Sequence, residues 1–461
     1  MTSKEAARER LLSAELAQVL NAAAFAGPDT NPWRARWIAA AVVLFGAFVT
    51  VSVAWLRADD ATTAAQEPVA FDPVFPWYEQ EFPWVMAMPI VTELDDLAEL
   101  PPEVDRLSVS VDDQELLLAV IRRGGIRALQ LYTKVEPVRL GPAVWQALGG
   151  MNDLEALATP RLRASAAEIR ELRRLPNLRT LVLAAGDIEL DAEIGGVLAE
   201  LSKLRAIVTS GLRLHPEGIA ALANLPDLDV LYFDSSPLDD AAFDAITKLR
   251  GLRSLLLFGA FQQDRSSPRL TAAQMRKLAG MPRLAALSLT HFELDDEVLR
   301  QLPRTLQSLS LTGVQGVTAA GLRAVGAMQQ LRSLRVGEDA LPLQDELMQV
   351  IAALPLERFT WAGRNMPATL WSALQQRPRL RGLCFGRSKD LAATMSDCAK
   401  VTALELLEIG LEHAPNAEQL APLVGHAALR RLVILGPAEI TPKRLAELRA
   451  RLGEQVEVIV R

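Results

Sequence analysis

The chain is 461 residues long, half of its residues are hydrophobic and 23% are charged, so it has enough apolar material for a large core and is not disordered. Its formal net charge of −7 is mild for this length, and no block of Lys and Arg stands out as a phosphate-binding surface, which argues against nucleic acid as a partner. Two cysteines are too few for a disulfide framework, and the lack of any Asn-x-Ser/Thr sequence favours a bacterial protein.

The first predicted element is a transmembrane helix at residues 37–56. This stretch reads WIAAAVVLFGAFVTVSVAWL, twenty residues without a charge, which is the length that a helix needs to cross about 30 Å of hydrocarbon. Several basic residues precede it in the short segment 1–36, whereas Arg57 is followed by Asp59 and Asp60. The excess of basic residues before the helix places segment 1–36 in the cytoplasm.

Two alternatives to a transmembrane helix remain open at this point. A cleaved signal peptide would find small residues at 52–54 and 63–65, but the 36-residue leader is long for that role. A buried core helix is disfavoured because nothing around the stretch resembles part of the same globule. A stripe of small residues, Gly46, Thr50 and Ala54, leaves a homodimer open but unsupported, because ordinary membrane composition also explains it.

Residues 57–103 are predicted to form a linker and an N-terminal cap. The linker begins with small residues, and five prolines then occur between Pro68 and Pro89, interspersed with Phe, Trp and Tyr. Proline at this density argues against a regular helix or strand. We expect this segment to lay aromatic surface over the open end of the domain that follows.

Residues 104–461 repeat one phrase, L-x-x-L-x-L, mostly at intervals of 24 to 26 residues. Apolar residues at the fourth and sixth positions alternate with their neighbours, which predicts a strand with one buried face. A last strand, QVEVIV, follows at 455–460. The leading positions of the phrase are Val104, Ile126, Leu154, Leu178, Leu204, Leu228, Leu252, Leu284, Leu306, Leu331, Leu356, Leu380, Leu404 and Leu429.

Each repeat also carries the signature of a short helix. In ITPKRLAEL, Thr441 is a good N-cap and Pro442 occupies the first helical position. The same pattern recurs in VTAAGLRAV, LTAAQMRKL, LDDAAFDAI and LHPEGIAAL. Every repeat is therefore predicted to be a strand followed by a helix. A period of this length indicates a solenoid, in which about fifteen parallel strands share one continuous core.

The phrases LRSLRV, LQSLSLTG and LRGLCFGR make the chain resemble a leucine-rich repeat protein, and GIAALANLP and AAGLRAVGAM are similar to the bacterial subclass with helices on the convex face. The resemblance implies an α/β horseshoe, with a parallel sheet on the concave side, whose concave surface binds other proteins. The family's asparagine at the ninth position is absent, which puts its asparagine ladder in doubt. Gly186, Ser236, Phe292 and Val314 stand there instead.

No pattern in the chain indicates catalysis, a cofactor or a metal. There is no GxSxG, HExxH or Walker sequence, and no dinucleotide-binding GxGxxG between a strand and a helix. Cys384 falls on the concave side of its repeat and Cys398 on the helical leg, so they should not form a disulfide. His413 and His426 are similarly dispersed, which argues against a zinc site. We predict that the protein is not an enzyme.

The fifth position of the phrase should face solvent on the concave side, yet it is apolar in four consecutive repeats. We predict that these residues, extended on either side, form a protein-binding patch. The last of these repeats, which begins at Leu252, has a surplus loop, GAFQQDRSSPR, and the alternative is that Phe261 in this loop covers the patch. The predicted partner-binding residues are Val182, Val208, Val230, Tyr232, Leu256, Phe258 and Phe261.

Arginine recurs at the second position of the phrase. At this position it is more typical of the solvated start of a strand than of a ligand site. This arginine column comprises Arg179, Arg205, Arg253, Arg332, Arg381 and Arg430. Together the patterns predict a scaffold tethered to the bacterial inner membrane, with its repeat domain in the periplasm and an unknown protein as partner. A cytoplasm-facing membrane adaptor is one alternative, with which free thiols are compatible. A translocated repeat effector is another.

Overall fold

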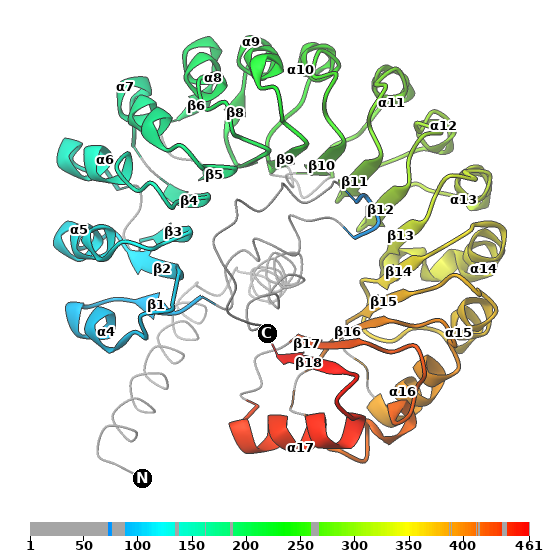
Figure 1. The fold of residues 1–461 in the computed structure, drawn as a ribbon. Coiled ribbons are helices and arrows are strands. Elements are labelled where there is room, and N and C mark those ends of the chain that lie inside the picture. The colour runs from blue at the N-terminus through cyan, green and yellow to red at the C-terminus, as the bar shows by residue number, and fades with distance from the viewer. Residues whose placement is uncertain are drawn as a thin grey trace, which may run out of the picture.

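A computed structural model describes residues 72–75 and 88–460, apart from gaps at 134–137, 162, 185–187, 260–266, 387, 389, 412, 414 and 436–439. The described chain forms an arc of strand–helix coils, with the strands on the inner side and the helices on the outer side (Figure 1). Sixteen strands form one sheet in chain order, and all its neighbouring pairs are parallel. This architecture confirms the predicted leucine-rich repeat solenoid.

The strands of the large sheet are β1 Ile90–Val91, β2 Arg106–Ser110, β3 Ala128–Tyr132, β4 Ala156–Arg161, β5 Thr180–Ala184, β7 Ala206–Ser210, β9 Val230–Asp234, β10 Ser254–Phe258, β11 Ala286–Thr290, β12 Ser308–Thr312, β13 Ser333–Val336, β14 Arg358–Trp361, β15 Gly382–Phe385, β16 Leu406–Gly410, β17 Arg431–Leu435 and β18 Glu457–Val460. A two-stranded sheet pairs β6 Glu189–Leu190 with β8 Arg213–Leu214.

The α-helices of the described residues are α4 Leu94–Glu99, α5 Gln114–Arg123, α6 Pro142–Leu148, α7 Ala166–Arg170, α8 Ala192–Ala199, α9 Pro216–Ala221, α10 Asp240–Ile246, α11 Ala272–Ala279, α12 Asp296–Arg300, α13 Ala319–Gly326, α14 Gln344–Ala353, α15 Ala368–Gln375, α16 Leu391–Ala399 and α17 Pro442–Leu452. Short 3-10 helices are η1 Glu171–Arg174, η2 Leu222–Asn224, η3 Glu338–Leu343 and η4 Ala421–Leu423.

The fourth and sixth positions of the phrase point into one core between the sheet and the helices. In the register of the sheet, Leu287 lies between Leu255 and Leu309, and each of the three is at most 2% exposed. Because equal positions of successive coils stack, the core continues along the whole arc. Leading residues of distant repeats belong to the same cluster, among them Leu178, Leu228, Leu306 and Leu404.

The predicted helix starts are confirmed where a side chain caps the helix. The Thr441 hydroxyl accepts a hydrogen bond from the Arg444 amide at 3.3 Å, and the Thr271 hydroxyl accepts one from the Gln274 amide at 3.2 Å. A helix in every repeat was also predicted, and this is wrong between β16 and β17, where the described residues contain only η4. Pro422 lies within η4, and proline disfavours the α conformation in the residue before it.

Two observations concern the segments before the repeats. Strand β1 and helix α4 lie within the predicted cap region 57–103 and add one strand to the fifteen that the phrases predict. Segment 1–36 and the predicted transmembrane span at 37–56 lie outside the described residues. Among the described residues, no helix combines the length and the apolar character that crossing a bilayer requires.

Neighbouring coils approach closely where α8 and α9 meet. A Cβ atom on Gly218 would overlap the carbonyl oxygen of Leu190, and one on Gly195 would lie 2.5 Å from the carbonyl oxygen of Gly218. A side chain at either position would therefore push the two backbones apart. Gly196, in the same helix as Gly195, is exposed. A Cβ atom on Gly196 would have no neighbouring atom within 4 Å.

Replacing Gly218 with alanine should lower the free energy of unfolding by about 1–3 kcal/mol, because the added methyl group overpacks the contact between coils. Gly196→Ala is the matched control and should raise the stability by up to about 1 kcal/mol, since alanine favours the helix and meets no neighbour. Urea denaturation of the two variants measures the difference. Equal stabilities would contradict the close approach of α8 and α9.

Candidate partner-binding face

The fifth position of the phrase lies on the concave face, because neighbouring residues of a strand point to opposite sides and the fourth and sixth positions fill the core. Across β5, β7, β9 and β10, the side-by-side residues of this row are Val182, Val208, Tyr232 and Leu256. Ser288 continues the row on β11. The structure therefore brings the predicted apolar row together.

An apolar cluster separate from the leucine core occupies this face, and we call it the concave patch. Its buried members are Met88, Ala128, Ala156, Ala206, Val230, Tyr232 and Leu256, and Val208 and Phe258 pack half-buried against them. Of the predicted partner-binding residues, Val208, Val230, Tyr232, Leu256 and Phe258 belong to the patch. Val182 is half-buried beside Val208 but is not part of the cluster, and Phe261 lies outside the described residues.

The burial of the patch differs from the sequence expectation. The fifth-position row was expected to face solvent, and this is wrong for Tyr232 and Leu256, which are 9% and 5% exposed. The alternative was that the loop around Phe261 covers the patch, and Phe261 lies outside the described residues. Met88 lies just before β1 and packs in the patch, so the N-terminal cap region supplies part of its contacts.

A buried carboxyl group borders the concave patch at the carboxyl end of β9. Asp234 accepts hydrogen bonds from the Ser210 hydroxyl at 2.8 Å and from the Ser235 hydroxyl at 2.9 Å. Burial raises the pKa of Asp234, although both hydrogen bonds oppose the shift. Burial and the nearby Asp234 also raise the pKa of Tyr232 well above its ordinary value, so the Tyr232 hydroxyl keeps its proton at neutral pH.

Two non-glycine residues with positive φ flank the patch. Ser235 has a φ of 52° after β9 and His291 a φ of 57° after β11, whereas the same turns after β7 and β12 use Gly211 and Gly313. The His291 ring packs edge-on against Phe258, with ring centroids 4.9 Å apart. Burial lowers the pKa of His291, so its ring is neutral at pH 7 and extends the apolar surface.

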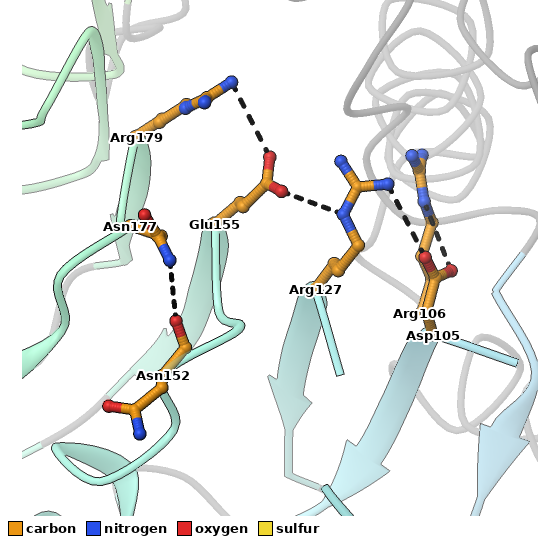
Figure 2. A network of polar contacts seen from close by, with 7 residues as sticks. All are labelled: Asp105, Arg106, Arg127, Asn152, Glu155, Asn177 and Arg179. Atoms are coloured by element: carbon orange, nitrogen blue, oxygen red, sulfur yellow. Dashed lines mark hydrogen bonds and ion pairs between the residues drawn. The ribbon is translucent and has the colours of Figure 1, made fainter. Parts of the chain in front are cut away.

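Charged side chains form a ladder along the amino-terminal edge of the sheet. Glu155 accepts a hydrogen bond from Arg127 Nε at 2.8 Å and lies 3.8 Å from an Arg179 nitrogen (Figure 2). Arg127 also lies 3.7 Å from Asp105, so Arg127 and Glu155 each contact the coil before and the coil after their own. The ladder links successive repeats through opposite charges in one column.

The arginine column at the second position mostly belongs to this ladder. Arg205 and Arg253 share Asp229, at 2.6 Å and 3.3 Å, and the Asp229 side chain is only 12% exposed. The same pairing recurs in Arg332–Glu357 and Arg381–Glu405. This column therefore stacks the repeats, in the absence of the family's asparagine ladder, and does not form part of the concave patch.

The two cysteines considered for chemistry are separated and buried. Cys384 lies on β15 and Cys398 on α16, and both are buried free thiols. Burial raises the pKa of Cys384 to about 12, so it stays a thiol at neutral pH. Within the part of the chain that the structure describes, no group of three or more His, Cys, Asp or Glu side chains could hold a metal ion.

A second concave feature, at β14 to β16, was missed at the sequence level. Arg358 Nη2 donates a hydrogen bond to Glu408 Oε2 at 3.0 Å across β15, and the two side chains are 9% and 5% exposed. The signal was present, because both charged residues stand in inner-face positions of the phrase. Arg358 occupies the third position of its repeat and so lies outside the arginine column at the second position.

No protein-family model matches the chain, and no curated protein matches it. Among solved structures, a leucine-rich repeat protein of Leptospira interrogans is 16% identical, with 80% of this chain and 92% of that chain covered and a TM-score of 0.31. An internalin of Listeria monocytogenes is 16% identical, with 76% and 94% covered and a TM-score of 0.33. The repeated phrase and the coils described above show that this chain has a leucine-rich repeat fold.

Replacing Asp234 with asparagine should raise the free energy of unfolding at neutral pH, because it removes a buried charge. The amide keeps one oxygen that accepts from one serine, and its NH2 group can donate to the hydroxyl oxygen of the other. The pKa of Asp234 is higher in the folded chain than its ordinary 3.8, so the wild type loses stability as the pH rises from that value through the folded pKa. The stability lost to the buried charge is about 1.4 kcal/mol for a tenfold change in the proton affinity of the carboxyl group between the unfolded and folded chain.

The advantage of Asp234→Asn should be largest at neutral pH and should vanish below about pH 3.8, where the carboxyl group is protonated in both states. Thermal unfolding of the variant and the wild type between pH 3 and pH 7 measures it, with Asp227→Asn at an exposed position as the control. An advantage that does not depend on pH would show that burial of the Asp234 charge is not its cause.

Proposed function

We propose that this chain is a protein-binding scaffold whose partner docks on the concave patch. The observation that carries the proposal is the separate apolar cluster around Val230, Tyr232 and Leu256, on the face of the sheet that the leucine core does not use. Apolar patches that become exposed are typical of protein-binding surfaces, and solenoids use their concave side for this purpose.

Access to the patch requires a rearrangement. Tyr232 and Leu256 are buried in the chain by itself, and Met88 packs in the same cluster. A partner must therefore displace the contacts that bury these side chains, or add to the half-buried rim at Val208 and Phe258. Binding by displacement lowers the affinity by the free energy of the contacts that are lost.

We further propose that residues 37–56 tether the solenoid to a bacterial inner membrane and that the repeats lie in the periplasm. The twenty uncharged residues and the basic residues before them support this placement. A cytoplasm-facing adaptor is the second candidate, because Cys384 and Cys398 are free thiols in the structure, as is usual in a reducing compartment. The buried position of both thiols weakens that argument.

The proposed activity is binding and not catalysis. The titratable groups with shifted pKa values at the patch, Asp234, Tyr232 and His291, are shifted mainly by burial. Asp234 is held by two serine hydroxyls and His291 packs on Phe258. These contacts stabilise the face.

A photo-crosslinking amino acid at Val208 should capture one discrete protein in native membranes, because Val208 is half-buried at the rim of the patch. The same amino acid at Arg323, exposed on the outer helix α13, should not capture it. Tyr232→Asp together with Leu256→Asp should abolish the product at Val208 while the helical circular dichroism is retained. A product that persists in this folded double variant would remove the site assignment.

Alkaline phosphatase fused after Arg461 should be active in a bacterial host, because the enzyme needs the oxidising periplasm and the proposed topology places the repeats there. A β-galactosidase fusion at the same position should be inactive and serves as the reciprocal control. The opposite pattern of activities would favour the cytoplasm-facing adaptor.

A further inference from the structure

Residues 72–75, Asp-Pro-Val-Phe, form a small turn that lies inside the arc, away from β1 (Figure 1). The Asp72 Oδ1 atom accepts hydrogen bonds from the amide of Val74 at 2.8 Å and from the amide of Phe75 at 3.2 Å. Val74 is 6% exposed, so the turn buries an apolar side chain although it precedes the first strand. The turn is therefore folded against the repeats.

Arg358 on β14 holds the turn at two points. Its Nη1 atom donates a hydrogen bond to the carbonyl oxygen of Val74 at 3.2 Å. Its guanidinium carbon lies 5.5 Å from the centroid of the Phe75 ring, within the range of a cation–π contact. One side chain thus contacts both the backbone and the aromatic ring of the turn, and these residues are 284 positions apart in the sequence.

Gly382 makes room for the aromatic ring. A Cβ atom at this position would lie 3.0 Å from Cε1 and 3.2 Å from Cζ of Phe75. Gly382 stands on β15 between Arg358 and Leu406 in the register of the sheet, and both neighbours carry long side chains. The missing side chain leaves a recess in this row of the inner face, and the edge of the Phe75 ring lies over it.

Glu408 orients the arginine. Arg358 Nη2 donates to Glu408 Oε2 at 3.0 Å, with both side chains almost fully buried. A buried ion pair costs desolvation energy, so it contributes little stability by itself, but it fixes a planar guanidinium in one direction. With one nitrogen on Glu408, the guanidinium presents the other to a carbonyl oxygen. The guanidinium is therefore already oriented to bind a backbone carbonyl oxygen.

We propose that Arg358, Gly382 and Glu408 form a peptide-recognition site, and that the chain's own Asp72–Phe75 turn is its resident ligand. The ligand chemistry is an aspartate-capped turn with an apolar residue at its third position and an aromatic ring at its fourth. A peptide of the same kind binds in trans once the resident turn is weakened. The inference does not depend on a partner at the concave patch, which lies on β3 to β10.

The resident turn competes strongly because it is part of the chain. A covalently linked ligand acts at an effective concentration of about millimolar, so an external peptide meets an occupied site. Removing the side chains of Val74 and Phe75 weakens the resident turn and leaves the site itself unchanged. This difference between cis and trans binding makes the proposal measurable with the protein alone.

The test uses purified full-length chain in detergent and a fluorescent peptide with the sequence of residues 70–77, AFDPVFPW. The variant Val74→Ala with Phe75→Ala should bind the peptide at least tenfold more tightly than the wild type, as measured by fluorescence anisotropy. Adding Gly382→Val should abolish the binding, because a side chain then fills the recess. Adding Ser333→Val, in the same row on β13, is the matched control and should leave the binding intact.

Absence of peptide binding by the double alanine variant, or equal binding with and without Gly382→Val, would overturn the proposal. A second measurement does not depend on these variants. A benzophenone amino acid replacing Phe75 should crosslink, within one chain, to the tryptic peptide that begins at Gly382. Crosslinks that join two chains would make a second copy the occupant, and crosslinks elsewhere in the chain would remove the site; either result contradicts the resident ligand.

Discussion

The structure depends on one constraint: no single repeat of this chain can bury its own leucines. A strand and a helix of this size expose most of their apolar surface, and only the next coil covers it. Equal positions must therefore stack, as Leu255, Leu287 and Leu309 do. Stacking in register also aligns every other position of the phrase, so any residue type that recurs at one position becomes a continuous row in the folded chain.

This constraint explains why the fold could largely be predicted from the sequence, whereas the burial of the concave patch could not. The strand positions follow from the period of the leucines, and helix starts such as Thr271 follow from local capping chemistry, so both are properties of a few neighbouring residues. The burial of Tyr232 and Leu256 depends on groups such as Met88 that are distant in the sequence. No periodic pattern predicts where a segment without repeats will pack.

The same reasoning separates the two charged features of the sheet. At the second position, arginine and acid recur in neighbouring coils, and the resulting ladder, with Asp229 between Arg205 and Arg253, links the repeats. Arg358 and Glu408 stand in different rows, two coils apart, so their ion pair is not one step of a ladder that repeats along the arc. A charged pair that is buried and unrepeated in a repeat protein is explained by what it contacts, and the contact here is the turn at 72–75.

The inner face therefore carries two regions of different chemistry. The concave patch is apolar, with few directional groups beyond Tyr232 and Asp234, so a partner of the proposed kind would bind it mainly by burying apolar area. The site at β14 to β16 combines an oriented guanidinium with a recess, which selects by shape and hydrogen bonding. Met88 packs in the first region and Val74 is held at the second, so the cap region contacts both. The two contacts are different in kind, since Met88 adds only apolar packing whereas Val74 is held through its backbone carbonyl oxygen by one guanidinium.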